Sequence, residues 1–175
     1  ASLQQKEMYT CVLKGHLALA NINFPIGSSG ANLDTIARQY LWANGLDYPH
    51  ATGHGVGNAI NVHEGPHAIS NNNDVSLCAN MIVSNEPGFY IEGSYGIRIE
   101  NLMYVAAGAH ENFLCLRHLT LLPYDEALIN KDMLTEQEIM WIKGYYSKIA
   151  DEVTPLLSVE ARLWLKRQLE WILAQ

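Results

Sequence analysis

Five ionisable side chains lie in short apolar runs that are punctuated by glycine: His50, His54, His63, Glu86 and Glu100. A carboxylate among apolar residues is tolerated only when it is paired, hydrogen-bonded or bound to a cation. One imidazole and two carboxylates supply much of the ligand set of a divalent metal ion. The sequence therefore indicates the metal site of a hydrolase, with part of its ligand set present. The runs that carry these residues are 50–57, 61–66, 85–88 and 96–101.

Each of these residues also has a structural interpretation. A lone His54 would be favoured as a core histidine bonded to a backbone carbonyl, but its flanking glycines allow close approach of a ligand. His50 stays open between a cleft histidine and a structural loop histidine, whereas His63 is favoured as functional. Glu100 lies two residues from Arg98 on one strand face and could form an ion pair with it. His67 is interpreted as a surface-loop residue.

Through the four motifs HATGHGVG, NVHEGP, NEPGFY and GIRIEN, the chain resembles the pita-bread metallopeptidases, and most closely their aminopeptidase P (Xaa-Pro aminopeptidase) branch. The resemblance continues through Leu119–Pro123 to the C-terminus. It implies an α+β fold, namely a partial pita-bread fold in which a curved antiparallel sheet is flanked by helices. Residues 1–175 are then expected to be the C-terminal portion of the catalytic domain, with a helical extension at about 124–175.

The resemblance also implies a site with two divalent metal ions, usually Mn²⁺, held by two Asp, one His and two Glu. His54 then corresponds to the metal-binding histidine, and Glu100 to the carboxylate that bridges both metals. Glu86 corresponds to a ligand that is also the general base or acid towards the bridging water. His50 and His63 correspond to histidines that line the substrate cleft and stabilise the tetrahedral intermediate. Oxygen-rich ligation with a single imidazole suits manganese better than zinc.

Arg98 is expected to orient a metal-binding carboxylate without binding metal itself. The family's two Asp ligands lie on a strand pair upstream of the first helix seen here, and that strand pair is absent. Asp34 falls in a helical pattern and Asp47 just beyond it, so neither matches the missing ligands. The chain is therefore expected to be an inactive fragment that binds metal weakly or not at all. Without the strand pair, its sheet is expected to have an unprotected edge or a borrowed partner.

For the full-length protein, the resemblance implies removal of the N-terminal residue from peptides with proline in second position. The alternatives are a prolidase, which cuts Xaa-Pro dipeptides, and a non-catalytic pita-bread module that binds proteins. The run from His63 to Pro66 favours aminopeptidase P over prolidase. Retention of His54, Glu86 and Glu100 argues against the binding module.

Composition places the chain among compact globular proteins, because 49% of its 175 residues are hydrophobic and 17% are charged. The net charge of −7 argues against nucleic-acid binding, which needs a basic face. No run of 18 apolar residues occurs, so we expect no membrane span and a cytoplasmic protein. The three cysteines, Cys11, Cys78 and Cys115, are expected to be buried reduced thiols.

The hydrophobic periodicity predicts helices over residues 1–21, 33–43 and 159–173, and a further helix opened by a capping box at Thr135 and Glu138. Asn32 is the expected N-cap of the second helix. Trp141, Trp164 and Trp171 are expected to pack between the last two helices or, alternatively, to form a homodimer surface. The expected strands are 81–83, 95–100, 102–105 and 116–122, and residues 70–74 form a polar loop.

Overall fold

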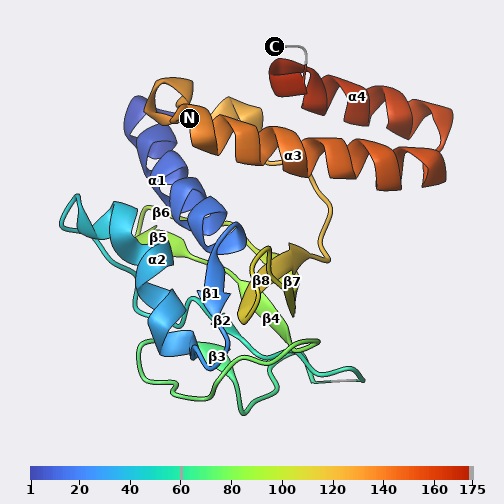
Figure 1. The fold of residues 1–175 in the computed structure, drawn as a ribbon. Coiled ribbons are helices and arrows are strands. Elements are labelled where there is room, and N and C mark those ends of the chain that lie inside the picture. Colours follow the sequence, from blue (N-terminus) through green and yellow to red (C-terminus); the bar gives the residue numbers. More distant parts are fainter. Residues whose placement is uncertain (60, 174–175) are drawn as a thin grey trace. The chain divides into compact units, whose positions relative to one another are not determined.

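The structure is a computed structural model that describes residues 1–59 and 61–173 (Figure 1). It divides into two compact units, one formed by residues 1–10 with the segment from 121 onward, and the other by residues 11–120. The described residues contain four α-helices and antiparallel strands, so the predicted α+β class is confirmed. No helix in the described ranges is both long and apolar enough to cross a membrane.

The second unit is built on a four-stranded antiparallel sheet with the strand order β1-β8-β7-β4. Two short hairpins, β2 with β3 and β5 with β6, accompany this sheet. The strands span Asn23–Pro25 (β1), Gly53–His54 (β2), Ala68–Ile69 (β3), Ile82–Asn85 (β4), Gly88–Ile91 (β5), Tyr95–Arg98 (β6), Asn101–Ala107 (β7) and Phe113–His118 (β8).

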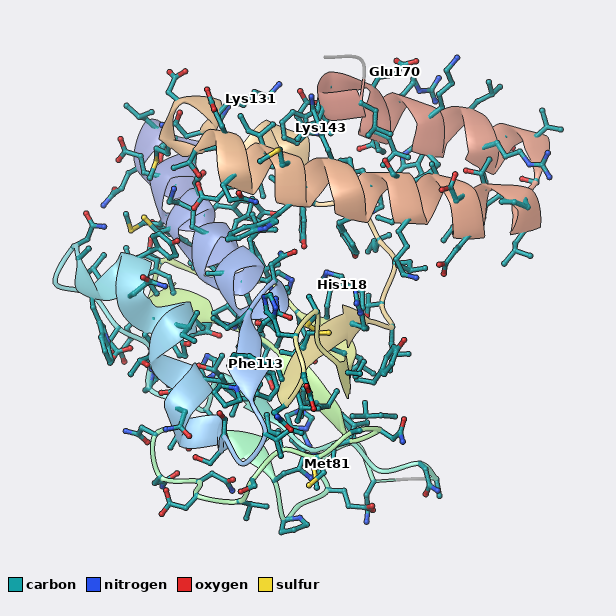
Figure 2. The ribbon with its side chains drawn as sticks, in the orientation of Figure 1. Met81, Phe113, His118, Lys131, Lys143 and Glu170 are labelled. Atoms are coloured by element: carbon teal, nitrogen blue, oxygen red, sulfur yellow. The ribbon has the colours of Figure 1, made fainter. Side chains whose placement is uncertain are left out.

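Two helices supply the apolar side chains that pack against this sheet. Helix α1 spans Leu3–Ala20 and enters the second unit at Cys11, and helix α2 spans Gly30–Trp42. The half-buried Met81 packs at the margin of the resulting core (Figure 2). Buried members of this core are Leu19, Ala20, Phe24, Leu33, Ala37, Ile69, Leu77, Val83, Met103, Val105, Leu114 and Leu116.

Helix α2 begins three residues earlier than the sequence predicted. Its N-cap is Ser29, and Asn32 is the third helical residue, whose Oδ1 accepts a hydrogen bond from the Ser29 backbone N–H at 2.9 Å. The prediction of Asn32 as N-cap was therefore wrong, because its side chain reaches back to the cap instead of forming it. Gly30 fits the first turn since a Cβ there would lie 1.6 Å from the Ala68 carbonyl oxygen.

The expected strands all occur, with ends that differ by a few residues, but four others were missed. The missed strands β1, β2, β3 and β5 are two to four residues long, too short for an alternating pattern to be recognised. The expected unprotected edge or borrowed partner stays a prediction for the sheet, but the edge at β4 is covered by residues of this chain. The Val56 N–H donates to the Ile82 carbonyl at 3.1 Å, so the segment after Thr52 covers that edge.

In the first unit, helices α3 (Glu136–Val153) and α4 (Val159–Leu173) form a hairpin through a 3₁₀ turn (Figure 1). The predicted capping box is confirmed, because Thr135 and Glu138 exchange hydrogen bonds. The tryptophans differ from one another. Trp171 packs edge-on against Tyr146, with ring centroids 6.1 Å apart, whereas Trp164 is 46% exposed.

Two of the three cysteines are buried as expected, namely Cys11 and Cys115. The expectation was wrong for Cys78, which is exposed. Its apolar neighbours Leu77 and Met81 turn towards the core, and the intervening loop leaves the thiol at the surface.

His16 lies in the apolar interior of the second unit with no solvent exposure. Burial, and to a lesser degree the charge of His118 at the end of β8 (Figure 2), lower the pKa of His16 from 6.5 to about 3. The unfolded chain therefore binds more protons than the folded chain between these two pH values. The stabilisation from neutral His16 is present above pH 6.5 and is lost progressively as the pH falls towards 3.

We predict that His16→Gln flattens the dependence of the unfolding free energy on pH between pH 7 and 4.5. The substitution removes the group whose protonation favours the unfolded state, although it also lowers stability at pH 7. Urea denaturation followed by circular dichroism at each pH measures the slope. The exposed His110, changed to Gln, is the matched control and should keep the wild-type slope. An unchanged slope in His16→Gln would contradict the prediction.

Candidate metal centre

His54, Glu86 and Glu100 converge at one point of the second unit. One ligand atom from each side chain lies within 4.8 Å of the others. The pairing of β4 with β7 explains how the two carboxylates meet. Asn85 pairs with Asn101 in antiparallel register, so the residue after Asn85 and the residue before Asn101 lie opposite each other.

The ring nitrogens of His54 have distinct environments. Nδ1 lies 2.8 Å from the carbonyl oxygen of Gly55, which can only accept, so Nδ1 carries the hydrogen in the neutral ring. Nε2 then presents its lone pair to Oε1 of Glu86 at 3.2 Å. Two acceptors at this distance need a proton or a cation between them. The donor set of one imidazole and two carboxylates therefore fits a divalent cation.

Ser84 is hydrogen-bonded to both His54 and Glu86. Its hydroxyl donates to Oε1 of Glu86 at 2.8 Å and accepts the backbone N–H of His54 at 2.9 Å. Gly53 permits this close packing, because a Cβ there would lie 1.9 Å from the Ser84 carbonyl oxygen. Sequence reasoning missed Ser84. Its place two residues before Glu86, on the same strand face, was the available signal.

Arg98 forms its ion pair with a different carboxylate from the one expected. Its Nη1 lies 3.4 Å from Oε2 of Glu86. The hydrogen bond to Tyr90, followed by the negative charges of Glu86 and Glu100, raises the pKa of Arg98. The guanidinium therefore stays cationic beside a carboxylate that is only 8% exposed.

His50 joins the site through Tyr90, a residue that sequence reasoning did not single out. Arg98 Nε donates to the Tyr90 hydroxyl at 2.9 Å, and that hydroxyl lies 2.9 Å from His50 Nε2. His50 Nδ1 faces the Ala51 carbonyl at 2.8 Å, so the neutral ring has a free lone pair on Nε2 for the tyrosine proton. A directed chain of hydrogen bonds therefore runs from Arg98 through Tyr90 to His50.

His63 lies beside His54 in space although the two are nine positions apart in sequence. Its ring centroid lies 4.1 Å from that of His54, and it is exposed. The prediction that His67 is a surface-loop residue was wrong. This histidine is half-buried, and its Nε2 donates to the Ile82 carbonyl at 2.9 Å, which anchors the loop that follows His63 to β4.

Comparison with known proteins identifies the family of this site. Residues 1–107 match metallopeptidase family M24, and residues 112–172 match the C-terminal region of peptidase M24. The chain therefore belongs to metallopeptidase family M24, and the predicted pita-bread relationship is confirmed.

Individual relatives agree with this assignment. The chain is 44% identical to aminopeptidase P1 of Arabidopsis thaliana over 97% of its length, which is 28% of that relative. The crystal structure of X-prolyl aminopeptidase from Caenorhabditis elegans, described as a cytosolic enzyme with a di-nuclear active site, superposes with a TM-score of 0.89. The two share 38% identity, over 99% of this chain and 29% of that one. Prolidase from Pyrococcus furiosus gives a TM-score of 0.55 and 32% identity, over 66% of this chain and 32% of that one. The chain thus spans under a third of the length of these relatives.

We predict that Ser84→Ala raises the dissociation constant for Mn²⁺ about ten- to a hundred-fold, the usual effect of removing a group that orients a metal ligand. The change removes the hydrogen bond that holds Glu86 and the acceptor of the His54 amide. Calorimetric titration with Mn²⁺ measures the ratio. Ser94→Ala, at an exposed turn, is the control and should leave the constant unchanged. Equal constants for Ser84→Ala and wild type would refute this role of Ser84.

Proposed function

We propose that this chain forms part of the active site of a metal-dependent Xaa-Pro aminopeptidase, which releases the N-terminal residue from peptides with proline in second position. The observation that carries the proposal is the convergence of His54, Glu86 and Glu100 within 4.8 Å. The ring of His63 lies beside that of His54, and His50 is linked through Tyr90 to Arg98, the ion-pair partner of Glu86.

His54, Glu86 and Glu100 would hold two divalent metal ions, and we propose Mn²⁺ because the donors are mostly oxygen. The relative from C. elegans is described as having a di-nuclear active site, which supports two ions. Bound ions of this kind lower the pKa of water and polarise a peptide carbonyl. Three side chains leave coordination positions open on two ions, and two Asp would complete the set.

The proposed roles of the chain's own residues follow from their contacts. Glu86 would accept and return the proton in hydrolysis, and Ser84 and Arg98 hold its two oxygens in place. His63 would donate a hydrogen bond to the oxygen that gains charge during the reaction. His50, whose ring nitrogens are bonded to the Ala51 carbonyl and the Tyr90 hydroxyl, would line the substrate cleft. Arg98 keeps a positive charge at the same place throughout.

The prolidase and binding-module alternatives have less support. The chain is 44% identical to aminopeptidase P1 of A. thaliana over 97% of its length, whereas it is 32% identical to the P. furiosus prolidase over 66%. A binding module would have no need for His54 and two glutamates within 4.8 Å. We further propose a cytoplasmic location, since the C. elegans relative is described as cytosolic. A homodimer through the face that carries Trp164 stays a prediction, supported by the exposure of that side chain.

We predict that the 175-residue chain alone does not hydrolyse peptides, and that a chimera does. In the chimera, this chain replaces the matching segment of the C. elegans enzyme, which the superposition over 99% of the chain allows. The chimera should cleave Xaa-Pro-Xaa tripeptides in the presence of Mn²⁺, as measured by release of the first residue. Cleavage confined to Xaa-Pro dipeptides would favour the prolidase alternative. A folded chimera without either activity would favour the binding module.

Substitutions of Glu86, His54 and His63 in the chimera should impair catalysis in different ways. Glu86→Gln should lower kcat about a hundred- to ten-thousand-fold, because it removes the proton-transfer group and a charged ligand. His54→Ala should lose bound metal first, and activity with it. His63→Ala should keep the metal and lower the rate. Metal analysis beside steady-state kinetics separates these roles. Loss of metal in His63→Ala and retention in His54→Ala would reverse the two assignments.

A further inference from the structure

Asp34 and Arg38 form a buried ion pair one turn apart on α2, outside the metal centre. Their side chains are 1% and 8% exposed, and Arg38 Nε lies 2.7 Å from Asp34 Oδ2. Burial of two charges costs desolvation that a pair of apolar residues would not incur. A contribution to stability is therefore a weak explanation for this pair, and its other contacts indicate what it does.

The guanidinium of Arg38 donates to several points on the segment that leads to the metal centre. Nη1 donates to Asp47 Oδ1 at 2.7 Å and to the Tyr48 carbonyl at 2.9 Å, and Nη2 donates to the His50 carbonyl at 2.7 Å. Burial disfavours the charged form, but the hydrogen bonds with Asp34 and Asp47 raise the pKa of Arg38. The permanently charged guanidinium of Arg38 therefore fixes the backbone of the segment that carries His50.

Asp34 connects the same helix to Glu86. Its Oδ1 accepts the hydroxyl of the fully buried Thr52 at 2.6 Å, and the Tyr48 hydroxyl hydrogen-bonds to the same Thr52 oxygen. The carbonyl of Thr52 accepts the backbone N–H of Glu86 at 2.8 Å. Thr52 is also two residues from His54. Through Thr52, the Asp34 side chain thus links α2 to both His54 and Glu86 of the proposed metal centre.

Residues 46–51 belong to no helix or strand. A segment of this kind has no backbone ladder to define its position, so side-chain hydrogen bonds must take that role. We propose that the Asp34–Arg38 pair, with Thr52, is a positioning device that sets where His50, His54 and Glu86 stand relative to one another. The consequence for metal binding rests on the proposed function. The consequence for the geometry of the segment does not.

The test uses the 175-residue chain and an isosteric pair of variants. Thr52→Val removes the hydroxyl at nearly constant volume, whereas Thr52→Ser keeps it. Arg38→Lys keeps the charge but loses the fork that reaches two carbonyls. Leu33→Ala is the matched control, because it removes a buried side chain of α2 that belongs to the apolar core, and leaves the hydrogen bonds of Asp34 and Arg38 in place. Nuclear magnetic resonance reports the Glu86 amide and the His50 ring, and calorimetry with Mn²⁺ alone reports metal affinity.

Thr52→Val and Arg38→Lys should shift the Glu86 amide and His50 ring signals and weaken Mn²⁺ binding about tenfold or more. Thr52→Ser should stay close to wild type, and Leu33→Ala should lower the melting temperature without moving either signal. Unchanged signals in both Thr52→Val and Arg38→Lys would overturn the proposal, as would equal shifts in Leu33→Ala. If the 175-residue chain, which carries only part of the ligand set, binds no Mn²⁺, affinity is measured in the chimera with the C. elegans enzyme. No binding there would contradict the proposed metal centre, and the resonance signals alone would then decide the positioning role.

Discussion

The second unit holds close together three side chains that repel one another, and the rest of its structure depends on this arrangement. The His54 lone pair and the carboxylates of Glu86 and Glu100 lie within 4.8 Å, and Glu86 is only 8% exposed. Water cannot screen these groups fully, so their approach has to be imposed by the fold and balanced by positive charge or hydrogen-bond donors. Arg98 and Ser84 supply that balance on Glu86, and the donor set leaves room for a divalent cation to supply the remainder.

Backbone pairing imposes the approach. The register between β4 and β7 sets Glu86 opposite Glu100, because Asn85 and Asn101 are partners. On the other side of β4, the segment from Thr52 to Val56 bonds to the strand and brings His54 to the same edge. Gly53 makes this possible, since any side chain there would collide with the Ser84 carbonyl. The three side chains therefore come from three segments that one strand, β4, brings together.

The main helices and the candidate metal-binding residues could be predicted from the sequence, because their local signals were strong. The helix that opens at Thr135 has a capping box, and α1 and α4 carry apolar residues at helical spacing with no proline inside them. These elements occur where they were expected. His54, Glu86 and Glu100 were identified because ionisable residues among glycines and apolar residues are costly without a partner. Short elements were missed for the opposite reason. β2 is two residues long, and nothing in so short a stretch distinguishes a strand from a loop.

The sequence by itself determined the chemical types at the site, the family resemblance and the main helices, since each depends on residues that are close along the chain. Only the tertiary structure decided which groups touch. It paired Arg98 with Glu86, placed Tyr90 between Arg98 and His50, and turned Asp34 from an ordinary helical residue into the partner of Arg38 and Thr52. These contacts join residues up to 40 positions apart. Strand register and helix packing set them, and neither can be read from spacing along a single chain.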